Sequence, residues 1–259
     1  MLSHSESKML YWSGDKSQGV AYQYIYSMAR WVLTDIHGCL RTLDTLLDRL
    51  ALATGDILYF LGDYVDRGPD SKGVIDRIWE LEKYYDVHCL RGNHEETVLR
   101  FNRLFGHRPV WAKYLNKAFW YSFGKPETLS DVDPRYFAWM EGLPYYFEVD
   151  QYLLVHAGID FSRAHPFLHP TELMWLRDWY STVDYDRLGD RYILHGHVPV
   201  VERELWEQYD YLERGRVLCL DGGTPNAHLE GFGYMSAFEL NEWRLLTQTS
   251  QEHEWLLEN

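Results

Sequence analysis

The sequence predicts an α/β protein in which two β-sheets pack against each other. Three observations predict this fold class: apolar strand-like runs alternate with helical stretches from Trp31 onward, strand signals resume after a helical middle, and the chain can bury a large core. The chain has 259 residues, 46% of them hydrophobic, and no repeat or linker divides it. We therefore expect one domain over 28–259, preceded by a peripheral extension over 1–27.

The first half of the domain is predicted to have the order βαβαβ. Apolar runs typical of strands occur at 31–34, 56–62 and 87–92, with amphipathic helical patterns at 41–53 and 71–85 between them. Strands joined in this way by right-handed helical crossovers are parallel. In such sheets ligands bind beyond the carboxyl ends of the strands, so we look for a functional site there.

A helical, aromatic-rich segment over 95–142 separates this half from the next, and we expect it to lie near the site. Strand signals then resume in five places: 145–149, 152–158, 192–197, 217–223 and 233–240. We expect these strands to form a second sheet that packs on the first.

Composition excludes several classes of protein. The formal net charge of −14 argues against broad binding to nucleic-acid duplexes, which needs Lys and Arg to neutralise phosphates. No apolar run reaches the length of about 18 residues typical of a membrane span, and the first residues lack the features of a secretion signal. The three cysteines are scattered, so we expect neither a disulfide framework nor a zinc ribbon. These features favour a cytoplasmic location.

Polar residues follow the predicted strands at the point where each one ends. The potential donors are Asp35 and His37; Asp63, Asp66 and Arg67; Arg91, Asn93 and His94; and His156 and His197. Each alone has an ordinary explanation, because Asp and Asn are common in turns and helix caps and a lone histidine is more often a core residue. Turn chemistry does not require all these motifs in order, so we interpret them as one site.

The stretches DIHG, GDYVDRG and RGNHE, followed by VHAG and GH, resemble the signature of the phosphoprotein phosphatase branch of the calcineurin-like metallophosphoesterases. The resemblance spans about residues 31–246. It implies a four-layer αββα sandwich of two mixed sheets, with a dinuclear metal site at the carboxyl ends of strands.

The resemblance also implies six metal ligands. Asp35 and His37 would bind the first ion, Asp63 would bridge both ions, and Asn93, His156 and His197 would bind the second. Mixed carboxylate, imidazole and amide donors suit divalent ions of this kind. We expect Mn²⁺, with Fe²⁺ or Zn²⁺ as alternatives.

Catalysis, by the same resemblance, would use a hydroxide between the two ions for in-line attack on phosphorus. His94, oriented by Asp66, would be the general acid. Phosphate oxygens would contact Arg67, Asn93 and Arg177, which lies in the stretch WLRDW. Arg91 could either bind phosphate or pair with a carboxylate of the protein.

Three functions are compatible with these residues. We expect first a serine/threonine protein phosphatase that also accepts small phosphomonoesters, so its partner would be a phosphorylated protein or a small phosphoester. The second is a symmetrical diadenosine tetraphosphate hydrolase, which would use the same chemistry on a phosphoanhydride. The third, an inactive scaffold that binds phosphorylated partners, predicts a missing ligand or acid. All six ligands and His94 are present, which disfavours it.

Overall fold

The computed structural model describes residues 28–108 and 117–252, so the predicted extension over 1–27 lies outside the described residues. Within this part, the strands form two sheets. The first sheet has the spatial order β3 (Asp86–Cys89), β2 (Ile57–Phe60), β1 (Arg30–Leu33), β8 (Tyr234–Glu239) and β9 (Arg244–Thr249). Strands β1, β2 and β3 are parallel, whereas β8 runs antiparallel to β1 and β9 antiparallel to β8.

The second sheet is also mixed. Its order is β4 (Tyr146–Val149), β5 (Tyr152–Val155), β6 (Tyr192–His195) and β7 (Val217–Cys219). Strands β5, β6 and β7 are parallel, and β4 pairs antiparallel with β5. The carboxyl ends of parallel strands from both sheets are therefore available to build one site.

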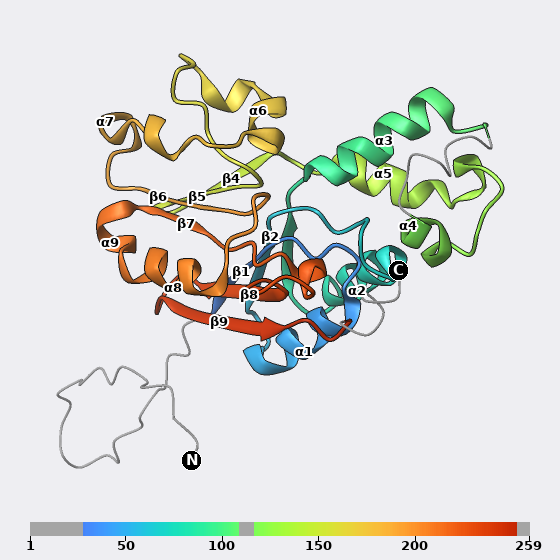
Figure 1. Ribbon diagram of the computed structural model, residues 1–259, viewed down its shortest axis with the longest axis horizontal. Coiled ribbons are helices and arrows are strands. Elements are labelled where there is room, and N and C mark those ends of the chain that lie inside the picture. The colour runs from blue at the N-terminus through green and yellow to red at the C-terminus, as the bar shows by residue number, and fades with distance from the viewer. Residues whose placement is uncertain (1–27, 109–116, 253–259) are drawn as a thin grey trace, which may run out of the picture.

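The helices and the two sheets form four layers. Successive side chains of a strand point to opposite faces of its sheet, so each sheet can pack on both faces. On β1, Trp31 and Leu33 pack in the core between the first sheet and helices α1 and α2. Val32 points to the other face and packs in a second core between the two sheets. Figure 1 shows α6 and α7 outside the second sheet and α1 outside the first. The predicted αββα sandwich is confirmed.

The helices differ widely in length. The α-helices are α1 (Leu40–Leu50), α2 (Ser71–Leu81), α3 (Asn93–Phe105), α4 (Lys117–Ser122), α5 (Pro134–Gly142), α6 (Pro170–Trp175), α7 (Tyr185–Leu188), α8 (Glu202–Asp210) and α9 (Leu212–Gly215). The 3₁₀ turns are η2 (Leu129–Asp131), η3 (Pro166–Leu168), η4 (Tyr180–Thr182) and η5 (Thr224–Asn226). Across the described ranges, none of these helices combines the length and apolar character needed to cross a membrane.

One prediction about the sheets was wrong. The stretch 233–240 was expected in the second sheet, but it forms β8, which pairs with β1 in the first sheet. Its six strand residues are all buried, because one face packs toward the helices and the other toward the second sheet. A strand buried on both faces carries no periodic signal of which sheet it joins.

The amino-terminal end of α1 is capped by a distant carboxylate. Glu252 is buried, and its Oε1 accepts hydrogen bonds from the backbone N–H groups of Arg41 at 2.7 Å and Thr42 at 3.2 Å. The first N–H groups of a helix have no partner within the helix, so this carboxylate supplies acceptors for two of them. Its negative charge also interacts favourably with the positive end of the helix dipole. The start of α1, which follows the DIHG stretch, is thereby fixed by Glu252, more than 200 residues later in the chain.

Candidate active site

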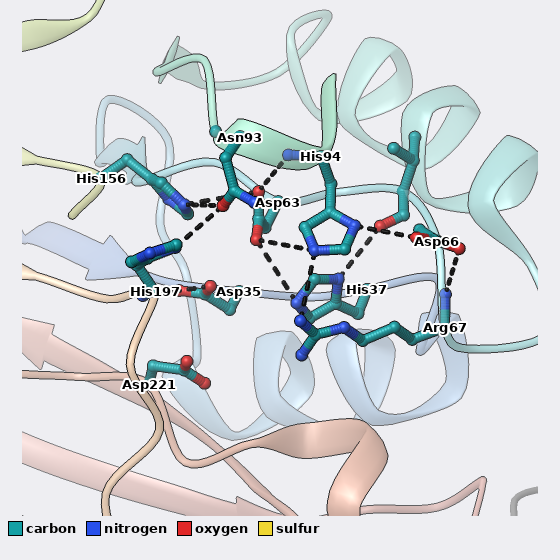
Figure 2. Close-up of polar contacts among 12 residues, drawn as sticks. Asp35, His37, Asp63, Asp66, Arg67, Asn93, His94, His156, His197 and Asp221 are labelled. Atoms are coloured by element: carbon teal, nitrogen blue, oxygen red, sulfur yellow. Dashed lines mark hydrogen bonds and ion pairs between the residues drawn. The ribbon is translucent and has the colours of Figure 1, made fainter. Parts of the chain in front are cut away.

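The six predicted metal ligands lie together at the carboxyl ends of strands from both sheets, and all six are buried (Figure 2). Asp35 and His37 follow β1, Asp63 follows β2, and Asn93 opens α3 after β3. From the second sheet, His156 follows β5 and His197 follows β6. The site is therefore built where the two sheets meet.

Asp63 is central to this cluster. Its Oδ2 lies 3.4 Å from Nε2 of His37, and its Oδ1 lies 3.4 Å from Nε2 of His156. In the described part of the chain, two groups of side chains have donor atoms close enough to hold a metal ion: His37, Asp63 and His94, and Asp63, His156 and His197. Both groups include Asp63, as a carboxylate shared by two ions requires.

Asn93 and Asp35 connect the remaining ligands. Oδ1 of Asn93 lies 2.9 Å from Nε2 of His156 and 2.8 Å from Nδ1 of His197. Both carboxylate oxygens of Asp35 accept from the backbone N–H of His197 at 3.2 Å, and its Oδ2 also accepts from the hydroxyl of Thr34. Asp35 is thus beside the cluster but is not in either of the two donor groups.

The backbone around the site is strained. Residues of the loops around the ligands adopt left-handed conformations, with φ of 48° for His37, 54° for Asp63, 73° for Asp66, 67° for Arg67 and 73° for His197. Such conformations are unusual for residues other than glycine, cost about 1–3 kcal/mol each and cluster at functional sites. Asp and His tolerate them better than most residues, which fits their use here.

Gly62 shows why the loop after β2 needs a glycine. Its φ is 111°, and a Cβ atom there would lie 2.7 Å from the nitrogen of Gly92 and 2.9 Å from Nδ1 of His156. Two ligand loops therefore approach each other more closely than any side chain would allow.

Glu95 holds these loops together, a role that the sequence did not reveal. This fully buried carboxylate accepts from four backbone N–H groups: Asp63 at 2.9 Å, Tyr64 at 2.8 Å, Val65 at 3.3 Å and Gly92 at 2.9 Å. Burial, followed by the charge of Asp63, raises the pKa of Glu95 to about 7. The four donors favour its ionised form against that desolvation.

His94 and Asp66 form the predicted pair at the edge of the cluster. Nδ1 of His94 lies 2.9 Å from Oδ2 of Asp66, and Nη2 of Arg67 lies 3.2 Å from Nε2 of His94. Burial lowers the pKa of His94, but the carboxylates of Asp63 and Asp66 outweigh it and raise that pKa to about 8. Burial raises the pKa of Asp66, but its hydrogen bond to His94 and the charge of that imidazole lower the pKa overall.

Two of the buried imidazoles are kept neutral. Burial, followed by repulsion from His94, lowers the pKa of His37 well below its usual value. Burial, followed by repulsion from His156, lowers the pKa of His197 to about 3, and the charge of Arg177 contributes in the same direction. A neutral imidazole is the form that binds a metal ion.

Divalent cations fit the charges of this site. Asp35, Asp63 and Asp221 are all buried, and within the described residues none of them pairs with a lysine or arginine. Burial, followed by the charge of Asp35, raises the pKa of Asp221 well above its usual value. Nε2 of His197 is also buried and has no hydrogen-bond partner among the residues that the structure describes. Unpaired buried carboxylates and an unused imidazole nitrogen are costly unless cations bind between them.

Asp221 was not predicted as a site residue, although it lies close to Asp35 and His197 (Figure 2). It follows β7, the last parallel strand of the second sheet. The rule that polar residues gather at strand ends applies to it equally, although Asp next to Gly is also common in turns and is a weak signal by itself.

The two remaining arginines lie in different surroundings. Arg91 is buried, its Nη1 donates to Glu96 at 3.0 Å, its Nη2 donates to the carbonyl of Glu141, and its guanidinium lies over the ring of Tyr145. These contacts give Arg91 a structural role between α3 and the end of α5. Arg177 is exposed and lies near enough to His197 for its charge to affect that imidazole.

Comparison with known proteins agrees with the fold. The sequence profile described as calcineurin-like phosphoesterase matches residues 28–219. The chain is 28% identical over 227 residues to the asymmetrical bis(5'-nucleosyl)-tetraphosphatase PrpE of Oceanobacillus iheyensis, covering 76% of this chain and 86% of that protein. It is 26% identical over 196 residues to serine/threonine-protein phosphatase 1 of Salmonella typhimurium, covering 72% and 86%.

A solved structure supports the fold. The metallophosphoesterase from Sphaerobacter thermophilus superimposes with a TM-score of 0.55 over 85% of this chain and 87% of that one, at 18% identity. At this identity the likeness concerns the fold alone. The match of the family profile covers most of the chain and includes every predicted metal ligand. This chain is therefore a member of the calcineurin-like phosphoesterase family.

Proposed function

We propose that the chain hydrolyses a phosphate ester or anhydride bond with two divalent cations, Mn²⁺ being the expected ion, and with His94 as general acid. The observation that carries this proposal is the His94–Asp66 pair, 2.9 Å apart, beside two groups of donors that share Asp63. His94 itself is part of one of these groups, so it lies within reach of anything bound there.

The six predicted ligands, Asp35, His37, Asp63, Asn93, His156 and His197, would hold the cations. When bound, two divalent cations would supply the positive charge that activates water and neutralises the nonbridging oxygens of phosphate. Asp66 accepts the Nδ1–H of His94 and thereby leaves Nε2 as the atom that can give a proton to the leaving oxygen.

Arg67 connects phosphate binding to this proton. Its Nη2 lies 3.2 Å from Nε2 of His94, so the guanidinium is beside the atom that would give its proton to the leaving oxygen. A phosphate group would attract this guanidinium through charge-assisted bidentate hydrogen bonds. The same phosphate would then lie next to the acid form of His94, which its two neighbouring carboxylates favour.

For the substrate, we propose a dinucleoside polyphosphate in place of the phosphorylated protein that we expected first from the sequence. The relatives' names support this order: the tetraphosphatase matches 76% of this chain, and the serine/threonine phosphatase matches 72%. That tetraphosphatase is named asymmetrical, whereas the sequence suggested the symmetrical kind.

A side-by-side assay tests this proposal. The full-length protein is stripped with a chelator, supplied with Mn²⁺, Fe²⁺ or Zn²⁺, and offered diadenosine tetraphosphate, a phosphoserine peptide and p-nitrophenyl phosphate. We expect the highest kcat/KM for the dinucleotide, and chromatography of its products distinguishes ATP plus AMP from two ADP. Preference for the phosphopeptide would overturn the substrate proposal. If no substrate were hydrolysed with any ion, the chain would be the phospho-binding scaffold.

A further inference from the structure

A pocket of about 410 Å³ opens next to the proposed metal ligands. Asp178 and Val198 line it, and they directly follow Arg177 and His197 in the sequence. Because successive Cα atoms are only about 3.8 Å apart, the pocket starts one residue away from a proposed ligand and a proposed phosphate-binding residue. The pocket wall and the site thus share the loop after β6 and the segment around Arg177, so a group bound in the pocket would lie close to a phosphate bound at the site.

The walls of the pocket suit a flat, partly apolar group. Tyr180, Pro199 and Val200 line it, with Tyr180 exposed at the surface and Val200 buried. The hydroxyl of Tyr180 lies 2.8 Å from Nε2 of His195, which fixes the position of the aromatic ring. Aromatic rings held in this way stack on nucleobases and give binding that tolerates different bases.

The charged residues of the pocket exclude a phosphate group. Asp178 and Glu204 contribute carboxylates, and the described residues that line the pocket include neither lysine nor arginine. An anionic group would be repelled, whereas hydroxyl and amino groups would find acceptors. Carboxylates bind the ribose hydroxyls of nucleotides in this manner in other folds.

We propose that this pocket binds one nucleoside of the substrate, as the subsite for the group next to the reacting phosphate. This inference rests on the proposed function, since a nucleoside there is useful only if its phosphate chain reaches the cations. The volume is within the range of about 300–1,000 Å³ that is usual for small-molecule sites. A phosphoserine side chain is too short to reach past the cations and would leave the pocket empty.

Substitutions that fill the pocket test this inference. Ser181 is an exposed residue of its lining, so Ser181→Trp should block the pocket without disturbing the core. Ser162→Trp is the matched control, because Ser162 is exposed in the loop after β5 and does not line the pocket. With Mn²⁺, Ser181→Trp should raise KM for diadenosine tetraphosphate about tenfold or more. It should leave kcat/KM for p-nitrophenyl phosphate within about twofold, and Ser162→Trp should change neither value.

A second measurement needs neither cations nor turnover. Binding of adenosine to chelator-treated protein is followed by ligand-observed NMR for wild type, Ser181→Trp, Ser162→Trp and Glu204→Gln. We expect binding by wild type and Ser162→Trp, no binding by Ser181→Trp, and weaker binding by Glu204→Gln. Circular dichroism identifies a variant that has not folded, and Glu204→Gln then carries the test.

The outcomes separate this inference from the proposed function. Unchanged KM for the dinucleotide in Ser181→Trp, with hydrolysis intact, overturns the pocket and leaves the hydrolase in place. A raised KM for the phosphopeptide alone also overturns it, because the pocket would then hold a peptide side chain. Adenosine binding that Ser181→Trp abolishes supports the pocket even if no phosphoester is hydrolysed.

Discussion

Replacing Glu95 by glutamine should destabilise the protein and loosen its metal site. Each carboxylate oxygen of Glu95 accepts from two backbone N–H groups, Oε2 from Asp63 and Gly92, and Oε1 from Tyr64 and Val65. Glutamine has one oxygen, so its NH₂ group would face two N–H donors. Leaving two buried donors without acceptors costs about 1–3 kcal/mol each, or about 2–6 kcal/mol together. That is a large share of the roughly 5–15 kcal/mol by which domains are stable.

Urea denaturation of chelator-treated protein measures this loss, and Glu80→Gln is the matched control. Glu80 is exposed and pairs with Arg77 at 2.9 Å, so its replacement should cost at most about 1 kcal/mol. Because Glu95 holds the backbone of Asp63, the variant should also gain less stability from added Mn²⁺ than wild type. An unchanged urea midpoint for Glu95→Gln would refute the reasoning, since it would mean that Glu95 is held in its protonated form, which glutamine resembles.

Three further predictions follow from the site. The raised pKa of His94 keeps its acid form present below about pH 8 and loses it above, so kcat should fall as pH rises through about 8. Asp66→Asn should move this fall to lower pH, and His94→Asn should reduce kcat about 10²- to 10⁴-fold. Gly62→Ala places a methyl group 2.7 Å from the Gly92 nitrogen at φ 111°, so thermal denaturation should show a loss of about 1–3 kcal/mol from strain alone. Mn²⁺ should raise the melting temperature of chelator-treated protein, because a ligand of the folded state stabilises it, and His197→Ala should reduce this rise.

For each of these predictions, one outcome would contradict it. A pH profile unchanged in Asp66→Asn would assign the proton to another group. Gly142→Ala is the control for Gly62→Ala, because a Cβ atom at the end of α5 meets nothing within 4 Å; equal losses for both would disprove the steric argument. A melting temperature that no divalent ion raises would argue against a metal site.

The strand pattern predicted where the candidate site residues gather, whereas the αββα sandwich and the set of metal ligands were implied by the resemblance to a known family. Parallel strands end at a common edge, so Asp35, Asp63 and Asn93, each placed just after an apolar run, had to come together. Strand β9 was not predicted, because residues 244–249 mix polar and apolar side chains at the edge of the sheet. Edge strands carry little apolar periodicity to recognise.

Other features depend on tertiary contacts, which the spacing of motifs along the sequence does not predict. Glu95 looked like the end of a motif, and only the fold shows that it accepts from two separate loops. The pocket beside Arg177 joins residues of η4, the loop after His197 and α8, which approach one another only in the folded chain. Arg91 was left open between two roles, and its buried contacts with Glu96 and Glu141 were not foreseeable from the GNHE motif.

The position of β8 has a consequence for how the molecule can be cut. The family profile ends at residue 219, and all the proposed ligands precede that point. A fragment trimmed to that boundary would contain the six proposed ligands but would lack Asp221; β1 would lose its neighbour β8, and α1 would lose the cap from Glu252. During synthesis, too, β1 could pair with β8 only after residues 234–239 had been made. The segment that carries the proposed ligands is therefore shorter than the segment that folds.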